Sequence, residues 1–202
     1  MNYQIVLDET LKNLKGKSKL LLHACCAPCS SYVIEYLSKY FEITILYYNP
    51  NIDTKEEFEK RLTELKRFVQ EFKTENDVKV VSLGYNSDEY LDEIKGLEEE
   101  KEGGKRCVKC FKLRLEKACL YAKKNNYDYF TTTLTISPLK NSKVINEIGH
   151  ELEIKYDMPY LYSDFKKREG YKRSIVLSHI YNLYRQDYCG CKFSKNRKVS
   201  YE

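Results

Sequence analysis

The segment 19–31 (KLLLHACCAPCSS) constrains the fold most, because a short apolar run leads directly into Cys25, Cys26 and Cys29. The run does not alternate with polar residues and it ends at turn residues, which is typical of a buried parallel strand. Pro28 suits the first turn of a helix, and a serine beside it can cap the free amides. The thiols are therefore expected between a strand end and a helix start, where ligands bind in open α/β sheets. Three soft ligands there indicate a bound metal or reactive sulfur.

The rest of the chain alternates between strand and helix patterns. Short apolar, β-branched runs predict strands, and apolar residues at helical spacing predict helices. We expect strands at 19–24, 41–48, 78–83, 128–134 and 158–162, and helices at 3–15, 29–40, 54–72, 87–94, 107–125, 142–155 and 168–185. This alternation predicts an α/β fold, with a single-domain parallel sheet and helices on both faces.

The domain is predicted to span residues 1–202, with three segments that differ from its core. Residues 1–17 would form an N-terminal helical extension, and residues 186–202 a basic tail that carries cysteines. The charged segment 95–106 contains glycines and precedes a cysteine pair. It is interpreted either as a mobile loop beside the site or as a solvated linker.

Composition indicates the cellular compartment of the protein and the chemistry of its cysteines. Hydrophobic residues make up 42% of the chain, enough for a core, but no apolar run is long enough for a transmembrane helix. The first residues lack the basic-then-apolar pattern of a signal peptide, so we expect a cytoplasmic protein. Structural disulfides are rare there, and most of the eight cysteines lie in three tight clusters. That distribution indicates metal ligation or redox chemistry.

A second thiol pair, Cys107 and Cys110, lies at positions i and i+3 at the start of a predicted helix. Such thiols share a helix face and can reach one metal centre. Two ligands from this pair and two from the first group would form a four-thiolate site for zinc or an iron–sulfur cluster, and spacing does not choose between them. Cys119 lies on roughly the opposite side of the same helix and is expected to be a buried core thiol.

The third group is Cys189-Gly190-Cys191. A disulfide across one intervening residue closes a small strained ring, and strained disulfides are easily reduced. Gly190 permits the tight turn that such a ring needs. The pair therefore favours a reversible dithiol, with metal ligands or inert thiols as the alternatives.

Two further residues lie at the same edge of the sheet, His23 at the end of the first predicted strand and Asp164 after the last one. His23 is either a proton donor beside the thiols or a structural histidine. Asp164 is either a metal ligand or a helix cap. The carboxyl-terminal third is also basic, so its cations form either a phosphate-binding surface or a solvated charged face. These cations are Lys166, Lys167, Arg168, Lys172, Arg173, Lys192, Lys195, Arg197 and Lys198.

Five motifs in order resemble the QueH family of epoxyqueuosine reductases, over about residues 18–194. They are 23–29 (HACCAPC), 48–52 (YNPNI), 106–116 (RCVKCFKLRLE), 131–138 (TTTLTISP) and 183–191 (LYRQDYCGC). The resemblance implies a Rossmann-like fold of the adenine-nucleotide-α-hydrolase type and a [4Fe–4S] cluster. It also implies the last step of queuosine biosynthesis, the reduction of epoxyqueuosine to queuosine in tRNA.

Carried over by motif, the resemblance implies cluster ligands at Cys25, Cys26, Cys107 and Cys110, and a redox-active pair at Cys189 and Cys191. It also implies an additional mononuclear iron, for which Cys29 and Asp164 are the candidates. Expected partners are tRNA with a queuosine-type anticodon base and an external electron donor, but no membrane. The first thiol segment contains no glycine, which argues against a phosphate cradle for ATP. The alternatives are a cluster-dependent tRNA sulfur transferase and a non-catalytic zinc-binding, RNA-binding protein.

Overall fold

Four parallel strands form the centre of the molecule in a computed structural model that describes residues 1–195. The strands are β1 (Ser18–Ala24), β2 (Phe41–Tyr47), β3 (Val78–Ser82) and β4 (Tyr129–Thr132), in the order β3-β2-β1-β4. The helices are α1 (Tyr3–Lys12), α2 (Ala27–Leu37), α3 (Lys55–Glu71), α4 (Asp88–Glu93), α5 (Lys105–Lys124), α6 (Ser142–Tyr156) and α7 (Gly170–Ile180), with 3-10 turns η1 (Thr133–Ile136) and η2 (Lys192–Ser194).

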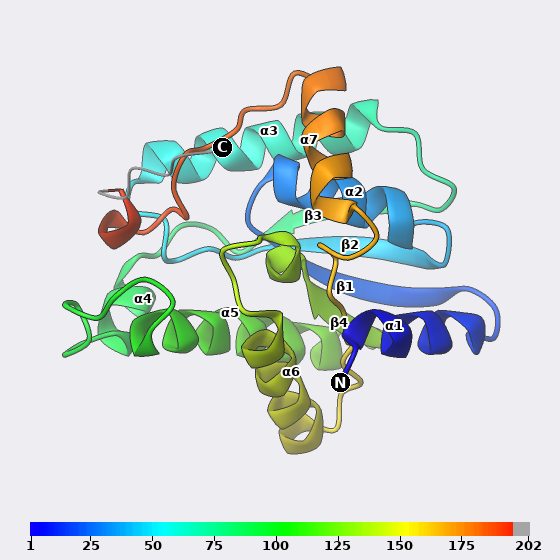
Figure 1. The fold of residues 1–202 in the computed structure, drawn as a ribbon, viewed down its shortest axis with the longest axis horizontal. Helices are drawn as coiled ribbons and strands as arrows, with labels where there is room; N and C mark the ends of the chain where they lie inside the picture. The colour runs from blue at the N-terminus through cyan, green and yellow to red at the C-terminus, as the bar shows by residue number, and fades with distance from the viewer. Residues whose placement is uncertain (196–202) are drawn as a thin grey trace.

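Helices cover both faces of this sheet. Figure 1 shows α2, α3 and α7 above it and α5 and α6 below it. In β1, Leu20 and Leu22 pack into the core on the α2 and α3 side, whereas Leu21 packs against α5 and α6. All three are fully buried, as expected for a strand covered on both faces. The predicted α/β fold, a parallel sheet with helices on both faces, is confirmed.

Several predicted boundaries are wrong, each for a local reason. The strand expected at 128–134 ends at Thr132, where η1 begins. The segment 158–162 makes only one isolated bridge, between Tyr160 and Phe130. The last helix is α7 rather than 168–185, because Glu169 adopts positive φ before it and Asn182 after it. Such left-handed residues interrupt helical hydrogen bonding.

The N-terminal segment and segment 95–106 both contact the rest of the fold, and the tail is described as far as residue 195. Leu7 and Leu11 of α1 pack into the main core, so the N-terminal extension is joined to the fold. Segment 95–106 is tied to α5, because Arg106 donates hydrogen bonds to the carbonyl oxygens of Glu98 and Glu100. Its mobility stays a prediction. Arg197, Lys198 and the rest of the tail beyond residue 195 lie outside the described residues. Within residues 1–195, no helix has the length and apolar character needed to cross a membrane.

Candidate metal and redox centre

The start of α2 is capped by a thiol. Cys26 is the N-cap in extended conformation, and its Sγ accepts the backbone N–H of Cys29 at 3.4 Å. We expected a serine in this role, but Ser30 and Ser31 donate their hydroxyls backward, to the carbonyl oxygens of Cys26 and Pro28. The predicted serine cap is therefore wrong, and Pro28 lies in the first turn as predicted. The consequence is that Cys25, Cys26 and Cys29 all face one point at the end of β1.

The sulfur atoms of Cys25, Cys26 and Cys29 lie within 4.8 Å of one another, and those of Cys25 and Cys26 are 3.8 Å apart. Hydrogen bonds from the other two thiols hold the pKa of Cys25 well below its ordinary value. Burial and the neighbouring thiol raise the pKa of Cys26 to about 12, and hydrogen bonds to Cys25 and Cys26 raise that of Cys29. Three clustered sulfur atoms, one of them with a lowered pKa, form a donor set that suits a soft metal.

The second pair lies at the start of α5, with Gly104 as N-cap. Cys107 Sγ accepts the backbone N–H of Gly103 at 3.2 Å. Cys110 is buried and packs with Cys191 in a small apolar cluster. Burial raises the pKa of Cys107, and it raises the pKa of Cys110 to about 12, with a further rise from charge at Cys189. This pair therefore faces the tail thiols.

The tail is held by groups far from it in sequence. Gly190 has φ +122° and its carbonyl oxygen accepts the backbone N–H of Asp53 at 3.0 Å. Arg61, held by Glu57 at 2.7 Å, donates to the carbonyl oxygen of Cys189 at 3.3 Å. A side-chain carbon at Gly190 would lie only 3.1 Å from Arg61 Nη1, so this turn requires glycine. Neither Arg61 nor Asp53 was identified from sequence, because nothing local links them to the tail.

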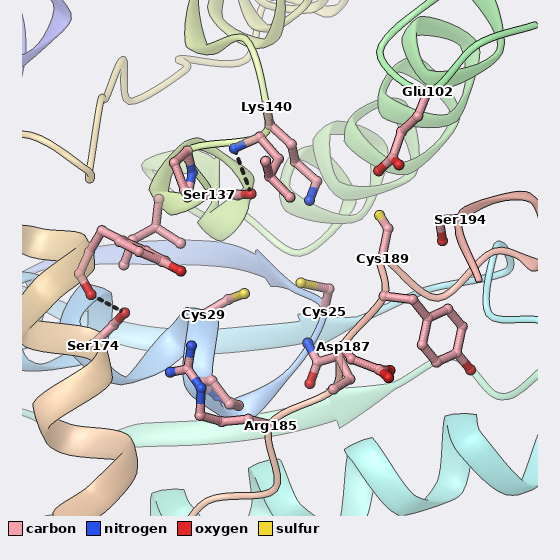
Figure 2. A pocket seen from close by; sticks show the side chains of 17 residues that line it. Cys25, Cys29, Glu102, Ser137, Lys140, Ser174, Arg185, Asp187, Cys189 and Ser194 are labelled. Carbon is pink, nitrogen blue, oxygen red and sulfur yellow. Dashed lines mark hydrogen bonds between the residues drawn. The ribbon is translucent and has the colours of Figure 1, made fainter. Parts of the chain in front are cut away.

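A cavity of about 310 Å³ brings thiols of two groups together. Cys25 and Cys29 line it from the sheet edge, and Cys189 lines it from the tail (Figure 2). Cys191 is 7% exposed and is directed elsewhere, toward Ser194 and Cys110. The two tail thiols therefore have different surroundings, one open to the cavity and one enclosed.

Arg114 on α5 connects the thiol groups electrostatically. It is 1% exposed and donates to Asn49 Oδ1 at 2.6 Å and to Cys110 Sγ at 3.9 Å. No carboxylate within residues 1–195 forms an ion pair with it, and the charges that raise its pKa against burial are those of Cys110, Cys25 and Cys189. A buried cation requires a compensating anion. Thiolates, or an anionic group that thiolates bind, fit this position. Sequence reasoning missed Arg114, although its i+4 spacing from Cys110 was a usable signal.

Comparison with known proteins shows which family the chain belongs to. A family model described as epoxyqueuosine reductase QueH matches residues 20–197. The chain belongs to the QueH family. A relative from Streptococcus pyogenes serotype M1 is 43% identical over 199 residues, covering 96% of this chain and 78% of its own. Relatives from Staphylococcus aureus strain Mu50 (43% identical; 96% and 85% covered) and Haemophilus influenzae (41%; 93% and 76%) carry the same name, epoxyqueuosine reductase QueH. The resemblance inferred from the five motifs is confirmed.

In this QueH chain, His23 is sealed in the interior. Its Nδ1 lies 2.8 Å from Thr132 Oγ1, and its Nε2 accepts from Arg114 Nε at 3.3 Å. Burial, with the charge of Arg114, lowers the pKa of His23 to about 3. A neutral histidine engaged at both ring nitrogens favours the structural alternative over the proton donor.

Asp164 does not join the thiols. Its carboxylate pairs with Lys166 at 2.6 Å and accepts the hydroxyl of Ser142 at 3.1 Å. It neither lines the cavity nor belongs to the thiol group around Cys29. It does not cap α7 either, because the N-cap there is Glu169. The geometry thus supports Cys29, but not Asp164, as a candidate metal ligand beside Cys25 and Cys26.

The basic residues of the carboxyl-terminal third are largely paired with carboxylates. Ion pairs join Lys166 to Asp164, Arg168 to Asp8, Lys172 to Glu169, Arg173 to Glu35 and Lys195 to Asp53. Exposed pairs of this kind are weak, so phosphates could displace some of the carboxylates. Their presence favours the solvated charged face over a dedicated phosphate-binding surface.

Proposed function

We propose that this chain is an epoxyqueuosine reductase, which converts epoxyqueuosine to queuosine in tRNA in the last step of queuosine biosynthesis. The observation that carries the proposal is the cavity where Cys25, Cys29 and Cys189 meet, beside the buried, carboxylate-free Arg114. Membership of the QueH family supports the same activity. Its partners would be tRNA with a queuosine-type anticodon base and an external electron donor, in the cytoplasm.

We further propose that Cys25, Cys26, Cys107 and Cys110 hold a [4Fe–4S] cluster. Four buried or partly buried thiols suit such a group, the buried cation Arg114 acts on two of them, Cys25 and Cys110, and the starts of α2 and α5 add favourable backbone N–H groups. When bound, the cluster would supply one-electron transfer between the dithiol and the substrate. Cys29 is the sulfur left in the same thiol group, and it is our candidate ligand for an additional mononuclear iron.

The tail dithiol would supply the electrons and protons that the reaction consumes. Opening and removing the epoxide oxygen takes two electrons and two protons, and it yields an alkene and water. Cys189 and Cys191 lose two electrons and two protons when they form a disulfide, so one dithiol matches one turnover. The external donor then reduces the disulfide, which the strained ring across Gly190 favours.

Anaerobic purification followed by an activity assay tests this function. The protein, reconstituted with iron and sulfide, should be brown, bind about four irons or more per chain, and convert epoxyqueuosine in tRNA to queuosine when given a reductant. Nucleoside analysis of the digested tRNA measures the conversion. A colourless protein that binds one zinc and leaves epoxyqueuosine unchanged would contradict the proposal and favour a zinc-binding, RNA-binding protein. ATP-dependent sulfur incorporation into tRNA would instead favour the sulfur transferase.

A further inference from the structure

Lys140 enters the cavity from the wall opposite the thiols. It ends the turn that follows η1, where its N–H donates to the carbonyl oxygen of Ser137 at 3.2 Å. The next residue, Asn141, caps α6 through its side chain. The backbone of Lys140 is therefore held on both sides, while its half-buried side chain lines the cavity. Figure 2 shows this side chain extending toward those of Cys25 and Cys189.

The negative charge that acts on Lys140 comes from cysteines that line the same cavity. No carboxylate within residues 1–195 forms an ion pair with it, although Glu102 and Asp187 line the same cavity. Burial lowers the pKa of Lys140, but charge at Cys189, Cys25 and Cys29 more than offsets this and raises the pKa above its ordinary value, with Arg114 opposing. The ammonium is thus retained at the place where the thiols meet.

The other polar groups near the thiols suit the reaction less well. His23 is sealed and does not line the cavity. Arg185 is exposed, and its guanidinium donates to Ser178 Oγ on α7 at 3.2 Å. Tyr171 and Tyr188 also line the cavity, but they carry no positive charge at neutral pH. Lys140 combines a positive charge, three hydrogen-bond donors and a position facing the redox thiols.

We propose that the ammonium of Lys140 binds the epoxide oxygen of the substrate and stabilises the negative charge that this oxygen gains as its carbon–oxygen bonds break. This inference rests on the proposed reductase activity. A cation aimed at an oxygen that develops charge acts most strongly in a site that excludes water. Lys140 would therefore be a catalytic residue that sequence reasoning did not identify, although it follows a strand end at the functional edge of the sheet.

Lys140→Met and Lys140→Arg test this role, with Lys143→Met as the matched control. Lys143 is exposed on α6, where it pairs with Glu147. In the reconstituted enzyme, K140M should lower turnover about 100-fold with unchanged iron content, and K140R should recover it to within about tenfold of wild type. K143M should behave as wild type. Wild type should also bind tRNA with epoxyqueuosine more tightly than tRNA with queuosine, and K140M should lose that difference.

Three results would overturn the role of Lys140. One is turnover by K140M within about threefold of wild type. Another is loss of iron from K140M, which would assign Lys140 to holding the metal centre. The third is a K140M variant that still distinguishes the two tRNAs, because a residue in contact with the epoxide oxygen must respond to its removal. Inactivity of the wild-type protein itself would instead contradict the reductase activity.

Discussion

Two thiols at the start of α2, Cys25 and Cys29, and one thiol of the tail, Cys189, line the same cavity, but different contacts position them. Cys25, Cys26 and Cys29 lie within five residues, and the helix start directs them to one point. The tail is held by Arg61 and Asp53, more than a hundred residues away in sequence. Helix geometry makes the first group rigid, whereas the tail depends on a few polar contacts. This difference suits a fixed metal centre opposite a dithiol that an external donor must reach.

The largest effect on turnover should come from substituting one cysteine in each thiol group. Cys25→Ala and Cys189→Ala should each lower turnover by at least about 100-fold, but only Cys25→Ala should also lose bound iron. The reason is that Cys25 would be a ligand, whereas Cys189 would carry electrons. Absorbance, iron analysis and conversion of epoxyqueuosine in tRNA measure both properties. Loss of iron from Cys189→Ala would show that the tail is part of the metal site.

Arg114 lies between the two regions, so its removal should weaken both. Arg114→Met leaves Asn49 Oδ1 without its donor and the buried thiol charge without a counter-ion. We expect a loss of about 3 kcal/mol in unfolding free energy, or roughly 6–12 °C in unfolding temperature for a chain of this size. Thermal unfolding under anaerobic conditions measures the change. Lys124→Met, at the exposed end of the same helix, is the control and should change stability by less than about 0.5 kcal/mol.

The contacts that position the tail can be weakened by substituting a residue other than a cysteine. Asp53 accepts the hydroxyl of Tyr188 at 2.9 Å and pairs with Lys195 at 2.5 Å. Asp53→Ala should therefore raise the rate at which Cys189 and Cys191 react with an alkylating reagent, by about tenfold, and leave Cys25 unchanged. Mass spectrometry after timed alkylation measures each site. The exposed Glu59→Ala on α3 is the control, and equal acceleration at Cys25 would contradict a local hold.

The smallest effect is expected at the thiol outside both regions. Cys119 is fully buried among α5 and α6 side chains, as predicted from its position on the helix. Cys119→Ala should cost about 1 kcal/mol of stability through a small cavity, and it should keep both iron and turnover. Urea unfolding and the activity assay check this pair of outcomes. A fall in iron content would show that Cys119 has a role in the metal centre.

Local sequence patterns predicted the helices and strands that are determined by residues close together in the sequence. The apolar run of β1 and the thiol segment after it were placed correctly, because strand burial and helix starts depend on neighbouring residues. Thr54 with Glu57 three residues later is the sequence pattern of a capping box, and Thr54 does cap α3, where its hydroxyl accepts the N–H of Glu57 at 3.2 Å. The carboxylate of Glu57, however, holds Arg61 rather than closing the capping box. That difference came from the fully buried guanidinium nearby, which no local pattern reveals.

Sequence alone determined the parallel α/β fold, the three thiol groups and, through the five motifs, the family. These follow from spacing within single elements and from motif order, which chain folding preserves. Only the tertiary structure decided that Cys189 lines the same cavity as Cys25 and Cys29, that His23 is buried, and that Arg114 and Lys140 lie near the thiols. The physical reason is that burial and charge pairing depend on which distant segments meet. At the edge of a parallel sheet, the ends of β1 and β4 and the tail come together from across the whole chain.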